Sequence, residues 1–134
     1  MPGKAFLDSN ILIYAVGEDD ARRAVADALI VQDAVVSAQV LAETASVLGR
    51  KLHVPAPSVE RILAVIVART RCEPLTAETV LAAVRLSGRL GYSHCDSQII
   101  AAALAAGCAV LHSEDMQHGQ VIDGTLTIVN PFVV

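Results

Sequence analysis

Residues 5–14 read AFLDSNILIY, and this stretch decides the fold. A short apolar run ends in an acid, two small polar residues follow, and a second apolar run begins. We interpret the pattern as a strand, a turn and a helix. Open parallel sheets bind ligands at the carboxyl ends of their strands, so Asp8 is expected to face that crevice rather than the core. Asp, Ser and Asn also cap helices, so this stretch alone leaves a purely structural role open.

The composition limits the kind of core that the chain can build. Its 134 residues fit one domain, residues 1–134. Hydrophobic residues make up 54% of the chain but aromatic residues only 3%, so the core must consist mainly of Ala, Val, Leu and Ile. Such small side chains favour helices packed closely on a buried sheet. The longest uncharged run, residues 97–113, is interrupted by Gly107 and does not read as a membrane span.

Cysteine usage and the amino terminus predict the compartment. The three cysteines show no metal-binding spacing and are interpreted as buried thiols in a reducing environment. They are Cys72, Cys95 and Cys108. Residues 1–4 lack the charged and apolar regions of a signal peptide. We therefore expect a soluble, cytoplasmic protein.

Apolar runs alternate with helical patterns along the chain. This alternation predicts an α/β fold whose central sheet has about five strands, is mainly parallel and carries helices on both faces. The further strands are expected at residues 34–37, 109–112 and 125–129, with a short strand or link at 72–75. The helices are expected at 11–16, from Glu18 to about Gln32, at 39–52, 58–70 and 77–90, and from about Ser93 to Gly107.

Helical spacing also predicts which faces point inward. For residues 39–52 the predicted core stripe is Leu41, Ala45, Leu48 and Leu52. For residues 77–90 the predicted inward side chains are Val80, Leu81 and Val84. The helix over 58–70 is apolar on more than one face, so residues 59–67 are the expected partner surface, for a segment of another protein or for a second copy of this chain.

Three further acids are predicted to lie at the same rim of the sheet as Asp8. Glu43 follows the strand over 34–37 by about two turns of helix, Asp96 lies near the start of an Ala-rich helix, and Asp115 follows the strand over 109–112. Each has a structural alternative, because Glu43 could lie on a solvated helix face and Asp96 fits a capping pattern with Ser93. Four neighbouring carboxylates repel one another, and Mg²⁺ or Mn²⁺ would relieve that repulsion.

The net charge of −4 argues against a nucleic-acid partner only if these four acids hold no metal cation. Setting aside four acids that hold a cation leaves the remainder formally neutral. The overall charge therefore does not exclude an RNA substrate.

The motifs FLDSN at 6–10, Ala42-Glu43, Asp96 before an Ala-rich helix, and Ser113-Glu114-Asp115 together resemble the four acidic blocks of the PIN domain. The resemblance covers essentially the whole chain, and its length is similar to that of VapC-type toxins. It implies a three-layer PIN-like fold, a metal-dependent endoribonuclease that cleaves single-stranded RNA and leaves a 5′-phosphate, an antitoxin partner and a homodimer.

The resemblance also implies roles for particular residues. The catalytic, metal-binding quartet would be Asp8, Glu43, Asp96 and Asp115, supported by Asn10 and Ser113. A water activated by bound Mg²⁺ or Mn²⁺ would attack the phosphodiester. Two positions depart from the toxin pattern: Glu114, where many members carry a basic residue, and Gln117, where some carry another acid. These departures bear on substrate choice and on a second metal ion.

Three other functions compete with this interpretation. A metal-free ribonuclease would need two imidazoles at the phosphate, and the histidines near the expected rim are also candidates for RNA contacts: His94, His112 and His118. A phospho-accepting receiver-like domain would want paired acids at residues 8–10 and a lysine after the last strand, and this chain has neither. A non-catalytic PIN-like interaction module would act through protein contacts alone.

Overall fold

The computed structural model describes residues 3–133 of the protein. The first two residues, part of the amino terminus in which we expect no signal peptide, lie outside that range. The strands are β1 (Ala5–Leu7), β2 (Val35–Ser37), β3 (Arg71–Glu73), β4 (Val110–His112), β5 (Val121–Ile122) and β6 (Leu126–Val129). The helices are α1 (Ser9–Ala15), α2 (Asp20–Leu29), α3 (Ala38–Arg50), α4 (Ala56–Arg69), α5 (Ala77–Leu90) and α6 (His94–Ala105).

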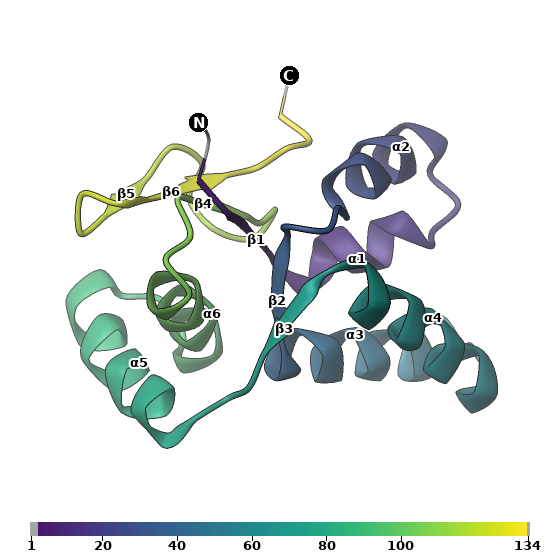
Figure 1. Ribbon diagram of the computed structural model, residues 1–134, viewed down its shortest axis with the longest axis horizontal. Coiled ribbons are helices and arrows are strands. Elements are labelled where there is room, and N and C mark those ends of the chain that lie inside the picture. Colours follow the sequence, from purple (N-terminus) through teal and green to yellow (C-terminus); the bar gives the residue numbers. More distant parts are fainter. Residues whose placement is uncertain (1–2, 134) are drawn as a thin grey trace.

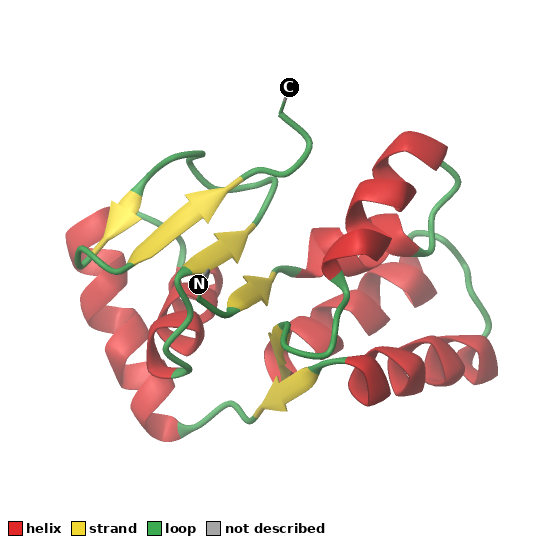
Figure 2. Cartoon of the chain, turned by 45° about the horizontal axis from the view of Figure 1, so that its top comes forward, coloured by secondary structure: helices red, strands yellow, loops and turns green. Residues whose placement is uncertain are grey.

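The strands form one sheet in the order β3-β2-β1-β4-β6-β5. Every neighbouring pair is parallel except the last, in which β5 runs antiparallel to β6. Helices α1 to α4 lie on one side of the sheet and α5 and α6 on the other (Figure 1), and the view in Figure 2 shows the sheet between the two groups. The predicted α/β fold with a mainly parallel sheet is confirmed. The two-residue strand β5 was not predicted, because two residues carry no periodicity.

Polar side chains cap five of the six helices in residues 3–133, including the two caps suggested above, in the stretch around Asp8 and at Ser93. The side chains of Asp8, Asp19, Ser37, Thr76 and Ser93 each accept a hydrogen bond from a backbone N–H in the first turn of the helix that follows. Such caps satisfy amide groups that the helix itself cannot pair. Asp8 is therefore a cap as well as a candidate site residue, and the two roles do not exclude each other.

The core is mainly aliphatic, with Phe6 among its residues, and two predicted helix faces are partly wrong, although Leu48 is buried and Leu41 packs against the core as predicted. In α3 the fully buried residues are Val40, Thr44 and Leu48, whereas Leu52 lies beyond the helix and is 52% exposed. In α5 the buried residues are Ala83 and Leu86, whereas Leu81 and Val84 are 61% and 57% exposed. Apolar spacing misassigned these faces because both helices carry aliphatic side chains on more than one side.

Helix α4 confirms the expectation of an apolar helix that is only partly covered. Of its residues only Ile66 is buried, while Val65 and Val67 are 55% and 46% exposed. The prediction of three buried thiols is wrong for two of them, since Cys72 and Cys95 are exposed and only Cys108 is buried. None of the helices in residues 3–133 is long and apolar enough to cross a membrane.

Candidate active site

Asp8 and Ser113 meet because β1 and β4 are parallel neighbours that end at the same level. Leu7 pairs with His112 in the sheet, so the next residue of each strand lies at the shared carboxyl edge. The Ser113 hydroxyl donates to Asp8 Oδ2 at 2.7 Å, and the Ser9 backbone N–H donates to Asp8 Oδ1 at 2.7 Å. Asp8 is only 3% exposed and Ser113 is fully buried. Both carboxylate oxygens of Asp8 are therefore fixed in orientation.

Asp115 is tied to the same point by a short loop. The Asp115 backbone N–H donates to the Ser113 hydroxyl oxygen at 3.2 Å, and Asn10 donates from Nδ2 to Asp115 Oδ2 at 3.2 Å. The side-chain oxygen of Asn10 accepts the backbone N–H of Glu114 at 3.3 Å. Asn10 and Ser113, both predicted to support the site, thus join the first turn of α1 to the loop that carries Asp115.

Glu43 lies on α3, which follows β2 on the other side of β1, and it ends a chain of amide hydrogen bonds. Gln39 donates from Nε2 to Glu43 Oε1 at 3.0 Å, and Gln98 donates from Nε2 to Gln39 Oε1 at 3.0 Å. His94 Nε2 lies 2.7 Å from Gln98 Oε1, an acceptor, so this nitrogen carries the proton that forms the bond. We call His94, Gln98 and Gln39 the amide chain; each member donates toward Glu43.

Asp96 lies in the first turn of α6 and is half-buried. Its backbone N–H donates to the Ser93 hydroxyl oxygen at 3.1 Å, as the capping pattern predicts. A second contact joins α6 to α3. Gln39 Nε2, part of the amide chain, donates to the backbone carbonyl oxygen of Cys95 at 3.0 Å. The start of α6 and the α3 face that bears Glu43 are therefore held together.

Burial and mutual repulsion raise the pKa values of three of these acids. Burial raises the pKa of Asp8 to about 6, with a smaller contribution from the charges of Glu43 and Asp96. Burial also raises the pKa of Glu43, with the charge of Asp96 adding to it. The pKa of Asp96 is raised by burial and by the charge of Asp115. The four acids are thus within reach of one another's charges at one rim.

No lysine or arginine in residues 3–133 forms a salt bridge with any of these four acids. Asp8 is buried, Glu43 and Asp96 are partly buried, and Asp115 is exposed. A buried carboxylate without a cationic partner is costly, and carboxylate oxygens are ligands that suit a hard divalent cation. Their donor chemistry therefore fits Mg²⁺ or Mn²⁺. In the described part of the chain no three His, Cys, Asp or Glu side chains already converge as a ligand set. Glu43 and Asp115 are instead held by the amides of Gln39 and Asn10.

Glu114 has a different environment from the four acids beside it. Its carboxylate accepts the Tyr14 hydroxyl at 2.8 Å and Arg22 Nη1 at 2.7 Å. Arg22 Nη1 also donates to the Tyr14 oxygen at 2.7 Å. We call Tyr14, Arg22 and Glu114 the Arg22 cluster. The position that departs from the toxin pattern is therefore neutralised from within the chain.

The three histidines lie in separate environments. His94 belongs to the amide chain, and His118 accepts the backbone N–H of Asn130 at 2.9 Å through Nδ1. His112 lies within β4, and burial lowers its pKa. Within residues 3–133 no hydrogen bond joins two of them, and none is bonded to a quartet acid. The arrangement gives the metal-free histidine mechanism no support.

Sequence reasoning missed the groups that hold the acids in place. Gln39 precedes Glu43 by four residues on the same helix face, and Gln98 is a nearly buried polar residue in an otherwise apolar helix. Both features are visible in the sequence and could have suggested a hydrogen-bonded role. The Arg22 cluster joins residues up to 100 positions apart in the sequence, so no local pattern could have predicted it.

The fold is similar to that of several solved protein structures. A toxin–antitoxin complex from Klebsiella pneumoniae contains a chain that is 19% identical, with 97% of this chain and 99% of that chain covered at a TM-score of 0.74. VapC20 of Mycobacterium tuberculosis, described as a sarcin-ricin loop cleaving toxin, is 23% identical over 83% of this chain and 89% of its own, with a TM-score of 0.64.

FitAcB from Neisseria gonorrhoeae is 19% identical, covers 97% and 99% of the two chains and gives a TM-score of 0.64. No curated protein sequence matches the chain significantly. The sequence profile of the PIN domain matches residues 5–122, a span that includes Asp8, Glu43, Asp96 and Asp115. The chain therefore belongs to the PIN domain family.

Proposed function

We propose that the protein is a metal-dependent endoribonuclease that cleaves single-stranded RNA and is the toxin of a type II toxin–antitoxin pair. The observation that carries the proposal is Asp8, a 3% exposed carboxylate whose pKa is raised to about 6, which lies near other acids and has no cationic partner in the described part of the chain. Such a group weakens the fold unless it serves a ligand of opposite charge. Family membership supports a nuclease over a receiver-like domain.

Asp8, Glu43, Asp96 and Asp115 would hold one or two Mg²⁺ or Mn²⁺ ions. A bound ion of this kind lowers the pKa of a coordinated water and offsets charge on the phosphodiester. The chain itself supplies orientation: Ser9 and Ser113 fix the two oxygens of Asp8, and Gln39 fixes one oxygen of Glu43. A carboxyl with a pKa of about 6 can also exchange protons near neutral pH.

The partners belong to the same proposal. We infer an antitoxin that covers α4 and a homodimer of the whole chain, residues 1–134, acting in the cytoplasm. Several apolar side chains support such contacts because they are exposed on the outer helices: Val65, Val67, Leu81 and Val84. A cavity of about 190 Å³ beside α4 is large enough to accommodate an apolar side chain of the antitoxin; its lining includes Ile62, Val65 and Ile66. His94, His112 and His118 remain candidates for RNA contacts.

The decisive experiment is cleavage of mixed cellular RNA by the purified protein with Mg²⁺, with Mn²⁺ or with EDTA. Wild-type protein should cut only with a divalent ion, and Asp8→Asn and Asp96→Asn should lose the activity. Asp20→Asn is the matched control, because Asp20 is exposed and paired with Arg23 at 2.6 Å, and it should cut like wild type. Cutting that survives EDTA would favour the histidines. No cutting by a folded, Mn²⁺-binding protein would favour the interaction module.

A further inference from the structure

A groove lies beside the candidate site, between α2 and the segment that follows β6. Its volume is about 310 Å³, and its lining includes Arg22, Val25, Pro131 and Phe132. One aromatic ring, one guanidinium and aliphatic carbon therefore border the same space. Flat surfaces of this kind suit a flat, unpaired ring.

Two groups that line the groove, Arg22 and Phe132, pack against each other and against Tyr14. The rings of Tyr14 and Phe132 meet edge to face with centroids 4.8 Å apart. The Arg22 Cζ atom lies 5.0 Å from the Tyr14 centroid and 5.5 Å from the Phe132 centroid. The chain has only two Tyr and two Phe, so half of its aromatic residues meet at this one place. Cation–π contacts of this kind hold the guanidinium in position before any ligand arrives.

Arg22 is fixed by its partners but retains unused hydrogen-bond donors. Nη1 donates to Tyr14 and Glu114, and Nε lies 3.5 Å from Asp19 Oδ2. Nη2 donates to no group in residues 3–133, and the side chain is 41% exposed. Because Asp19 and Glu114 already offset the charge of Arg22, the groove is poorly suited to a phosphate. A neutral ring with a hydrogen-bond acceptor fits it better.

A series of hydrogen bonds links Arg22, which lines the groove, to the candidate site. Glu114, which anchors Arg22, directly precedes Asp115, and its backbone N–H donates to Asn10. Asn10 in turn donates to Asp115. We propose that this groove binds an unpaired nucleobase of the RNA, stacked against Phe132 and Arg22 and accepting a hydrogen bond from Arg22 Nη2. The proposal rests on the proposed ribonuclease function and adds a base-binding subsite to it.

The test compares two single-stranded ten-nucleotide probes, a random-sequence RNA and the same ribose–phosphate chain without bases. Both are titrated by fluorescence anisotropy with Mg²⁺ against protein carrying Asp8→Asn, so that the RNA is not consumed. We expect Phe132→Leu and Arg22→Lys each to lose at least about fivefold affinity for the RNA but less than about twofold for the abasic chain.

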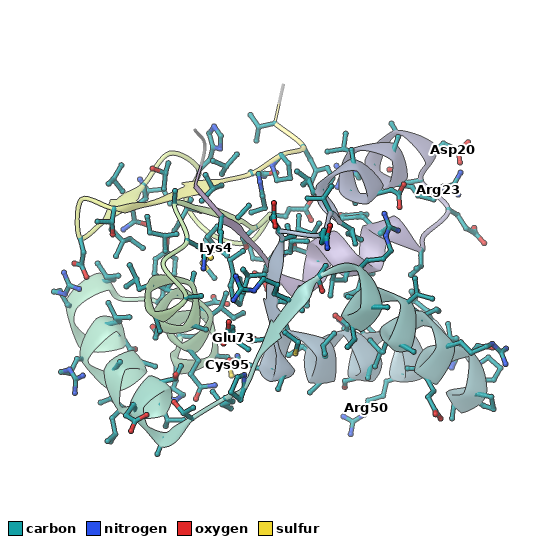
Figure 3. The ribbon with its side chains drawn as sticks, in the orientation of Figure 1. Lys4, Asp20, Arg23, Arg50, Glu73 and Cys95 are labelled. Carbon is teal, nitrogen blue, oxygen red and sulfur yellow. The ribbon has the colours of Figure 1, made fainter. Side chains whose placement is uncertain are left out.

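Matched variants separate stacking from charge and from folding. Arg23→Lys is the control for Arg22→Lys, because Arg23 lies on the same helix but pairs with Asp20 at the outer end of α2 (Figure 3). It should leave both affinities unchanged. Phe132→Tyr keeps the ring and should bind like the parent, which keeps the test valid if Phe132→Leu folds poorly in a thermal melt.

The outcomes distinguish the subsite from the function on which it rests. If the RNA and the abasic chain bind equally well, or if Phe132→Leu weakens both alike, the subsite is wrong while the nuclease proposal stands. If the parent protein binds neither probe, both proposals fail. Selective loss of RNA affinity in Phe132→Leu and Arg22→Lys, with retention in Phe132→Tyr and Arg23→Lys, supports the subsite.

Discussion

Glu43 and Glu114 lie on opposite flanks of the candidate site. Glu43 is on the helix that follows β2, Glu114 follows β4, and Asp8 follows β1 between them; the two carboxylates differ in whether a cation is bonded to them. Glu114 is bonded to an arginine and a phenol. Within residues 3–133 the Glu43 side chain is hydrogen-bonded only to the neutral amide of Gln39, and burial raises its pKa. The chain thus supplies a cation to one acid and withholds it from the other. The difference favours Glu43 over Glu114 as a ligand of the proposed metal ion, a distinction that their order in the sequence does not reveal.

Replacing Asp8 should give the largest change in the free energy of unfolding, because its carboxylate has no bonded cation and should destabilise the metal-free protein. Folding raises the pKa of Asp8 from an ordinary 3.8 to about 6. The protonated carboxyl therefore contributes its full share of folding stability below pH 3.8, and this contribution is lost as the pH rises through about 6. Asp8→Asn, measured in EDTA at pH 7.5 by urea unfolding, should gain up to about 3 kcal/mol.

The pH dependence of that gain is the check on its cause. Near pH 4 the gain should largely disappear, because the wild-type carboxyl is then protonated in the folded protein. Asp20→Asn, at an exposed acid paired with Arg23, should show no gain at either pH. A uniform destabilisation by Asp8→Asn at both pH values would contradict the view that the carboxylate is held without compensation.

The two glutamates themselves provide the second prediction. Glu43→Gln and Glu114→Gln make the same isosteric change, but only the first removes a proposed metal ligand. We expect Glu43→Gln to weaken Mn²⁺ binding by at least about tenfold and Glu114→Gln to change it by less than about threefold. Calorimetry on the purified protein measures both without reference to RNA cleavage. Equal losses in the two variants would remove the distinction between the flanks.

The amide chain offers a smaller test of the same idea. Gln98 is nearly buried and links His94 to Gln39, so Gln98→Leu breaks the chain at its centre while filling similar space. Gln39 would then lose a partner for its oxygen and hold Glu43 less firmly. Mn²⁺ affinity should fall by about tenfold, the lower end of the loss that is typical when groups that orient metal ligands are removed. Gln32→Leu, at an exposed position between α2 and β2, is the control and should bind Mn²⁺ normally.

Much of this arrangement was predictable from the sequence, and the reasons for the failures are physical. Acids that follow apolar runs predicted the rim where Asp8 and Asp115 lie, because strand ends in a parallel sheet share one edge. Local polarity could not distinguish Glu114 from Glu43, because the partner that neutralises Glu114 comes from α2. The exposure of Leu81 and Val84 could not be predicted either, since an exposed aliphatic face has the same residue spacing as a core face.

A surface ion pair away from the site should give the smallest effect and sharpens the contrast with the Arg22 cluster. Arg89 donates to Asp123 at 2.8 Å with both side chains about half exposed. Asp123 has a φ of 52°, a conformation that Asn adopts as readily as Asp, so Asp123→Asn removes charge without backbone strain. Solvent screening leaves such pairs little weight, and the melting temperature should shift by less than about 2 °C.

Glu114→Gln should lower the melting temperature further, because that carboxylate is less exposed and accepts bonds from both Tyr14 and Arg22. Salt screens exposed ion pairs more completely than partly buried ones. Added salt should therefore reduce the melting-temperature shift of Asp123→Asn by a larger fraction than the shift of Glu114→Gln. Differential scanning fluorimetry at low and high NaCl measures both variants together. If Asp123→Asn proves the more damaging change, the Arg22 cluster is a peripheral ion pair rather than the anchor of the loop that carries Asp115.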